Sequence, residues 1–227
     1  MQIRPIVTII AIYICSLWGA HLKAQQLTIK AGINRSDYIM GFYSPVFERV
    51  SKLNWGNGIG AKVGAEYSVP LLKFLDADLG MFYAQRRAVM EGQMSAESYE
   101  TRFTMQYIDI PLNLRLNLKK GNLKWHLRAG ILAGVLLHAQ QKILLFPLGI
   151  AEPKSVNYNQ FSIGGPENFK RVDLSSGLGA GVTWKKISLN VDYNQTIGSI
   201  VNEPENNNGS FIRWNNWNIS FGYLIGT

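Results

Sequence analysis

The chain has 227 residues, of which 47% are hydrophobic and 17% charged, and its formal net charge is +8. This length suits one domain, and its Lys and Arg residues are scattered rather than clustered, which argues against nucleic-acid binding. The single cysteine, Cys15, lies in an apolar N-terminal run, so the chain beyond that run has neither a disulfide nor a thiolate site.

The first 24 residues have the features of a secretory signal peptide. Arg4 makes the start basic, residues 6–18 form an apolar run, and Ala24 is a small residue for cleavage before Gln25. The thirteen residues of the run are too few for a membrane-spanning helix, which needs about 20. We therefore expect cleavage near Gln25 and a mature domain of residues 25–227, with its net charge lowered to +6 by the loss of Arg4 and Lys23.

Alternation with a period of two residues dominates the rest of the chain, and no segment keeps the spacing of an amphipathic helix. In residues 59–69, every odd position is apolar or aromatic, while the even positions are Gly, Lys, Glu and Ser. The same pattern predicts eight strands, which in chain order are residues 27–34, 59–69, 77–85, 108–118, 123–137, 172–182, 187–197 and 217–225.

The connections between these strands alternate between short and long. The short ones are residues 70–76, 119–122 and 183–186, and the long ones are residues 35–58, 86–102, 138–171 and 198–216. Outer-membrane barrels have short periplasmic turns and long external loops, whereas a soluble sandwich has no reason to sort its loops in this way. Closure also leaves no unpaired strand edge facing lipid. We predict an all-β fold, a single eight-stranded antiparallel up-and-down transmembrane β-barrel.

Pro111 needs an explanation within the fourth expected strand, because proline cannot donate to a β-ladder. It shares a face with Asp109 and Asn113, and two outward-type residues, Tyr107 and Ile108, adjoin shortly before it. We therefore predict a β-bulge in this strand.

Residues 107–112, Tyr-Ile-Asp-Ile-Pro-Leu, resemble a recurring strand of the PorT-like outer-membrane β-barrel family of Bacteroidetes. Residues 29–34, 128–130 and 177–181 support the resemblance, which covers essentially the whole mature chain. The chain departs from such barrels at its end, where Thr227 replaces the usual final aromatic residue. The resemblance implies location and architecture rather than an activity, with a protein-secretion role as an alternative.

Charged residues of both signs fall on the expected inward face of the strands. They are Lys30, Lys62, Glu66, Asp78, Asp109, Arg115, Arg128, Asp173 and Asp192. The interior of an eight-stranded barrel is just wide enough for its own side chains, so we expect these charges to pair and fill the lumen. A narrow conduction path lined by the same charges is the alternative.

His126 and His138 are the candidates for catalysis, since barrel enzymes that act on lipids combine a nucleophile with a His and an acid. Neither has a serine at same-face spacing on its own strand, and Arg128 beside His126 favours a neutral packing role. The sequence also has no residues at the spacing typical of metal ligands. We predict a protein that is not an enzyme and needs no cofactor.

The longest connection carries aromatic residues, namely Phe146, Tyr158, Phe161 and Phe169. Such side chains either form a partner surface or fold back over the barrel mouth, and both interpretations stay open. We expect a scaffold or surface-interaction protein. Its partners would be outer-membrane lipid and another envelope or secreted protein, but not nucleic acid, and the alternatives are a part of a secretion machinery or a narrow solute pore.

Overall fold

The computed structural model describes residues 26–41, 54–94, 97–147, 154–160, 170–200 and 211–225. Within these ranges there is no helix that is both long and apolar enough to span a membrane. The described strands are β1 (Gln26–Gly41), β2 (Asn54–Leu72), β3 (Leu75–Met94), β4 (Glu97–Lys120), β5 (Leu123–Pro147), β6 (Lys154–Gln160), β7 (Val172–Trp184), β8 (Ile187–Thr196) and β9 (Phe211–Ile225). The predicted signal peptide lies outside the described residues.

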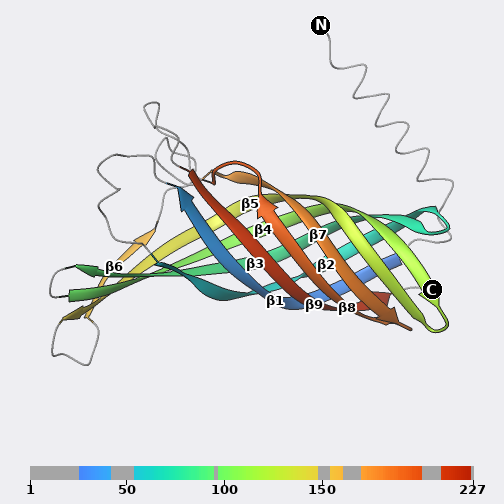
Figure 1. Cartoon of the computed structure of the whole chain (residues 1–227), viewed down its shortest axis with the longest axis horizontal. Helices are drawn as coiled ribbons and strands as arrows, with labels where there is room; N and C mark the ends of the chain where they lie inside the picture. The colour runs from blue at the N-terminus through green and yellow to red at the C-terminus, as the bar shows by residue number, and fades with distance from the viewer. Residues whose placement is uncertain are drawn as a thin grey trace, which may run out of the picture.

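Eight of these strands close into a ring (Figure 1). The order is β4-β3-β2-β1-β9-β8-β7-β5, and pairing of β4 with β5 completes the circle. All pairings are antiparallel. The predicted all-β, eight-stranded antiparallel barrel is therefore confirmed. The ninth described strand, β6, lies outside the ring and pairs with β5.

Three tight turns lie at one end of the barrel, as the short connections predicted. They are centred on residues 73–74, 121–122 and 185–186. Gly121 and Lys185 have φ angles of 62° and 54°, in the left-handed region that allows the chain to reverse within two residues. The pair Leu27 and Ile225 joins the first and last ring strands at this same end. We call it the turn end and the opposite end the loop end.

At the loop end, β3, β4 and β5 run well past their predicted limits (Figure 1). The β3–β4 ladder continues to Met94 and Glu97, and the β4–β5 ladder continues to Glu97 and Pro147. The predicted long loop at residues 86–102 is therefore wrong, because most of it is a paired hairpin. Backbone pairing continues there after the apolar alternation has stopped, and sequence alternation could not detect it.

The predicted bulge is on the neighbouring strand. In the β4–β5 ladder, Gln106 pairs with His138 and Tyr107 with Leu136, so Leu137 of β5 is the extra residue. Pro111 instead interrupts the β3–β4 ladder, which has no pair between Leu79 with Leu112 and Phe82 with Asp109. Its ring faces inward over Gly80, where a Cβ would lie 3.0 Å from Pro111 Cγ. The glycine on β3 thus makes room for the proline on β4.

Apolar side chains cover the outside of the barrel, while polar side chains fill the inside. Ile59, Leu178 and Phe221 are 64%, 67% and 64% exposed, whereas Glu66 and Arg86 are 2% and 1% exposed. This distribution is the reverse of that in a soluble protein and is the one expected where the outer face meets lipid.

Candidate functional site

The lumen contains stacked layers of charged side chains. In the layer nearest the turn end, Arg115 of β4 lies between two carboxylates of β3, with Nη2 3.0 Å from Asp76 Oδ2 and 3.2 Å from Asp78 Oδ1. Lys124 of β5 reaches over β4, so that its Nζ is 3.5 Å from the same Asp76 oxygen. The Asp76 carboxylate is thus shared by Arg115 and Lys124 and joins them in one layer.

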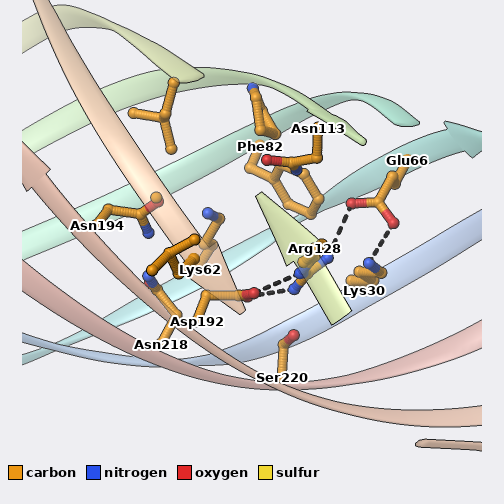
Figure 2. A pocket seen from close by; sticks show the side chains of 14 residues that line it. Lys30, Lys62, Glu66, Phe82, Asn113, Arg128, Asp192, Asn194, Asn218 and Ser220 are labelled. Atoms are coloured by element: carbon orange, nitrogen blue, oxygen red, sulfur yellow. Dashed lines mark hydrogen bonds and ion pairs between the residues drawn. The ribbon is translucent and has the colours of Figure 1, made fainter. Parts of the chain in front are cut away.

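The middle layer links four strands around the barrel axis (Figure 2). Lys30 of β1 pairs with Glu66 of β2, and Arg128 of β5 lies 3.2 Å from the second oxygen of Glu66. The Arg128 guanidinium also donates through Nε and Nη2 to the two oxygens of Asp192 on β8. Two cations and two carboxylates satisfy one another, and the two-pronged Arg128–Asp192 geometry fixes the guanidinium plane.

The third layer centres on Arg86 of β3. Its Nη2 lies 2.5 Å from Asp109 Oδ1 on β4, and its Nη1 lies 3.5 Å from Asp173 Oδ2 on β7. Lys62 of β2 adds a second cation, 3.8 Å from Asp109 Oδ2. Alternation had not identified Arg86, because the third strand was expected to end at Gln85. The signal that could have found it is the run of even, inward positions, which continues through residue 86.

Aromatic rings enclose the Arg86 guanidinium on its loop side. The guanidinium carbon is 3.3 Å from the centroid of the Trp214 ring and 3.9 Å from that of Tyr107. The two rings belong to an apolar cluster that occupies the loop end of the lumen. Its buried members are Tyr38, Ala88, Met105, Tyr107, Leu136, Ala139, Ile200 and Trp214. This apolar plug covers the third charged layer.

Glycines on β7 allow side chains from β5 and β8 to meet across it. Gly179 faces the Arg128–Asp192 pair, and a Cβ added there would lie 2.9 Å from Arg128 Nε. Gly181 lies similarly against the His126 ring, whose Nε2 is 2.9 Å from Asn190 Oδ1. Residues 177–181, which supported the family resemblance, thus have a packing role in the lumen.

A small and a large cavity lie in the lumen formed by the described residues. The inner one, between the middle and third layers, has a volume of about 30 Å³, which is comparable with that of one water molecule. The outer one, about 590 Å³, opens at the turn end. Six cationic and six acidic side chains take part in the layers, so their charges balance.

All nine inward charges singled out from the sequence take part in these layers, and Asp76, Arg86 and Lys124 join them. The two histidines lie apart, since His126 is buried near the turn end and His138 is half-buried beside the β5 bulge. In the described part of the chain, no three His, Cys, Asp or Glu side chains gather as a metal site would require.

The four aromatic residues predicted as loop contacts are placed only in part. Phe146 lies near the end of β5, opposite Ser98, and Tyr158 lies in β6, opposite Lys142. Phe161 and Phe169 lie outside the described residues. The two interpretations of these aromatics therefore remain open.

Comparison with known proteins gives one family. The model of the family described as "Outer membrane protein beta-barrel domain" matches residues 23–202. A comparison with curated proteins finds no match.

Several solved barrels are similar to the chain at low identity. OprG from Pseudomonas aeruginosa has 11% identity and a TM-score of 0.47, covering 90% of this chain and 98% of its own. The Neisserial surface protein A has 12% identity and a TM-score of 0.44, with coverages of 88% and 98%. Ail of Yersinia pestis, solved with the heparin analogue sucrose octasulfate, has 13% identity and a TM-score of 0.39, with coverages of 88% and 99%. No functional property carries over at these identities.

Proposed function

Since the chain belongs to the outer membrane protein beta-barrel domain family, we propose that it is a closed, non-enzymatic scaffold that binds another protein outside the membrane. It is an integral outer-membrane protein, and its tight turns face the periplasm while its loop end faces outward. We also propose that residues 1–24 form a signal peptide, which directs export and is then cleaved. The partner would be another envelope protein or a secreted protein.

The observation that carries the proposal is the filled lumen. Three charge-balanced layers and an apolar plug occupy the interior, and the cavity between the layers has a volume of only about 30 Å³. An ion crossing this interior would have to displace buried, mutually paired charges, at a cost of several kcal/mol for each separated pair. This packing argues against the solute-pore alternative and leaves the outer surface and the two ends of the barrel as places for binding.

The external extension of β3, β4, β5 and β6 supports a binding role. Pairing continues there to Glu97 and Pro147, which gives the extension a rigid backbone instead of a free loop. In its described part, Glu91 and Arg102 are exposed. Rigid segments that project from a barrel lose little conformational freedom on binding, which favours affinity.

Photo-crosslinking in intact cells tests this role. A photoreactive amino acid replaces Glu91 or Arg102 on the extension, and Leu178 on the lipid face is the matched control. We expect one discrete, heavier product from the extension sites and none from the control. No product from either extension site, in a protein that still assembles, would contradict the proposal. Stepwise conductance in planar bilayers would contradict its non-conducting part.

Membership of the PorT-like branch is proposed on residues 107–112 and 177–181, which lie in the ring strands β4 and β7. It makes a secretion component the second candidate function. Deletion of the gene should then remove proteins from the culture medium, and an unchanged set of secreted proteins would eliminate this candidate. An unchanged lipid A mass on overproduction is expected for a protein that is not a lipid-modifying enzyme.

A further inference from the structure

The cavity at the turn end differs from the rest of the lumen. It has a volume of about 590 Å³, within the range of binding pockets for small ligands. Its wall extends inward to Lys30, Arg115 and His126, and its rim includes parts of all three tight turns. Since it lies inside the ring of strands and opens to the periplasm, bilayer lipids flank it but do not occupy its axis. We call this cavity the periplasmic vestibule.

Positive charge predominates in the vestibule. Six cationic residues line it, and the single acidic residue is Asp76; the cations are Lys30, Lys73, Arg115, Lys119, Lys124 and Lys185. Asp76 is already shared by Arg115 and Lys124, and Lys30 is paired with Glu66. Within the described residues, Lys73 and Lys119 make no ion pair. The charged layers are balanced deeper in the lumen, so the excess positive charge lies at the mouth.

Polar atoms deeper in the vestibule also lack partners. Among the described residues, the buried atoms His126 Nδ1, Asn117 Oδ1 and Arg115 Nε make no hydrogen bond within the protein. Buried polar atoms are almost always satisfied, by protein, ligand or water. Each of these atoms has less than 1 Å² of accessible surface, so none of them faces the open part of the vestibule, and its binding groups are the cations of its mouth.

The arrangement of the cations indicates the kind of ligand. The lysines at the mouth lie at three separate turns: Lys73 between β2 and β3, Lys119 near the end of β4, and Lys185 between β7 and β8, where it also lies over the Trp184 ring. A single small anion cannot contact cations that are distributed around a ring. Apolar residues such as Leu72, Leu123 and Leu224 lie between them on the same wall. An extended polypeptide that carries several carboxylates among apolar side chains matches both features.

We propose that the periplasmic vestibule is a binding site for an acidic segment of a periplasmic polypeptide. The lysines at its mouth attract the segment and bind its carboxylates, and the apolar residues between them contact its apolar side chains. The barrel would thus bind partners on both sides of the outer membrane.

Adjacent lysines on the same turns provide a matched pair of variants. The test variant Lys119→Gln/Lys185→Gln removes two charges that line the vestibule, whereas the control Lys120→Gln/Lys186→Gln removes two neighbouring charges that do not. All four side chains are exposed, so neither variant should affect folding. The probe is a fluorescent hexaglutamate peptide, and the protein is held in phosphatidylcholine nanodiscs, which leave both faces open.

Fluorescence anisotropy should show binding that weakens as salt rises. The test variant should bind about fivefold more weakly, since each exposed ion pair contributes modestly, and the control should stay within about twofold of the wild type. Equal losses in both variants would indicate general surface charge and overturn the proposal, as would an absence of binding at low salt. Displacement by inorganic phosphate at equal charge would assign the site to small anions. If the protein retained phosphatidylglycerol but not the peptide, and lost the lipid in the test variant, Lys119 and Lys185 would bind lipid. Either of these two results would also overturn the proposal.

Discussion

The buried guanidinium of Arg86 provides the most direct test of how the lumen is held together. Its side chain is 1% exposed and pairs with Asp109, which is fully buried, and with Asp173. Replacement by methionine keeps much of the side-chain volume but removes the charge. Among the described residues, Asp109 would then keep only the Lys62 cation, at 3.8 Å, and Asp173 would have no paired cation.

We expect the Arg86→Met variant to lose about 3–5 kcal/mol of unfolding free energy, the range for breaking a buried ion pair and leaving a charge uncompensated. The same substitution removes the cation-π contacts with Trp214 and Tyr107, so the expected loss of unfolding free energy already includes their contribution. The double variant Arg86→Met/Asp109→Asn should recover part of the loss, because it also removes one uncompensated carboxylate. Arg102→Met is the matched control, because Arg102 is 54% exposed and its pair with Glu100 should contribute less than about 1 kcal/mol.

Urea unfolding in lipid vesicles, followed by Trp fluorescence and by heat-modifiability on gels, measures these differences. A loss below about 1 kcal/mol for Arg86→Met would mean that water solvates the third layer. The lumen would then not be closed to water at this layer. A double variant no more stable than the single one would show that uncompensated charge is not the cause of the loss.

Three further predictions concern other parts of the barrel. Ala129→Arg or Ala133→Arg, which place a charge on the lipid face of β5, should cost about 2–4 kcal/mol near the midplane, measured by the same unfolding assay. Gly179→Val should lower the free energy of unfolding by about 1–3 kcal/mol, because it displaces the side chains that meet across β7. Its control, Ala180→Val on the exposed face, should leave that free energy unchanged within error. Equal effects of the two substitutions would contradict the packing role of Gly179. Substitutions in residues 153–166 should leave the heat-modifiable shift unchanged, and a lost shift would show that barrel assembly needs this segment.

Alternation predicted the barrel because each membrane-crossing strand has one face in lipid. Residues 59–69 and 108–118 carry this signal throughout their length, and both lie within strands at the expected parity. The same parity placed Lys30, Glu66, Arg128 and Asp192 on the inner face of their strands, although it could not give their partners. Pairing of Arg128 with Asp192 depends on the strand order and on a glycine between them, and neither follows from the spacing within one strand.

The signal failed where lipid no longer constrains the outer face. Beyond Gln85, the outward positions of β3 include Arg87 and Glu91, so the apolar outer face ends there and the extension was not predicted. The bulge was assigned to the wrong strand for a related reason. Tyr107 looked outward-facing by its chemistry, but its ring faces inward and belongs to the apolar plug.

Paired charges fill this lumen in a way that apolar side chains could not. Replacing buried ion pairs by apolar groups of similar size is often neutral or favourable for stability, so stability alone does not explain six cations among six acids. Inward apolar residues would, however, make both faces of each strand alike. A shift of one residue in register would then no longer be penalised, because the inward and outward sets could exchange. Charges on the inner face keep the two sets distinct, and the apolar plug is confined to the loop end, where β3 to β5 extend beyond the lipid and register is set by the hairpins.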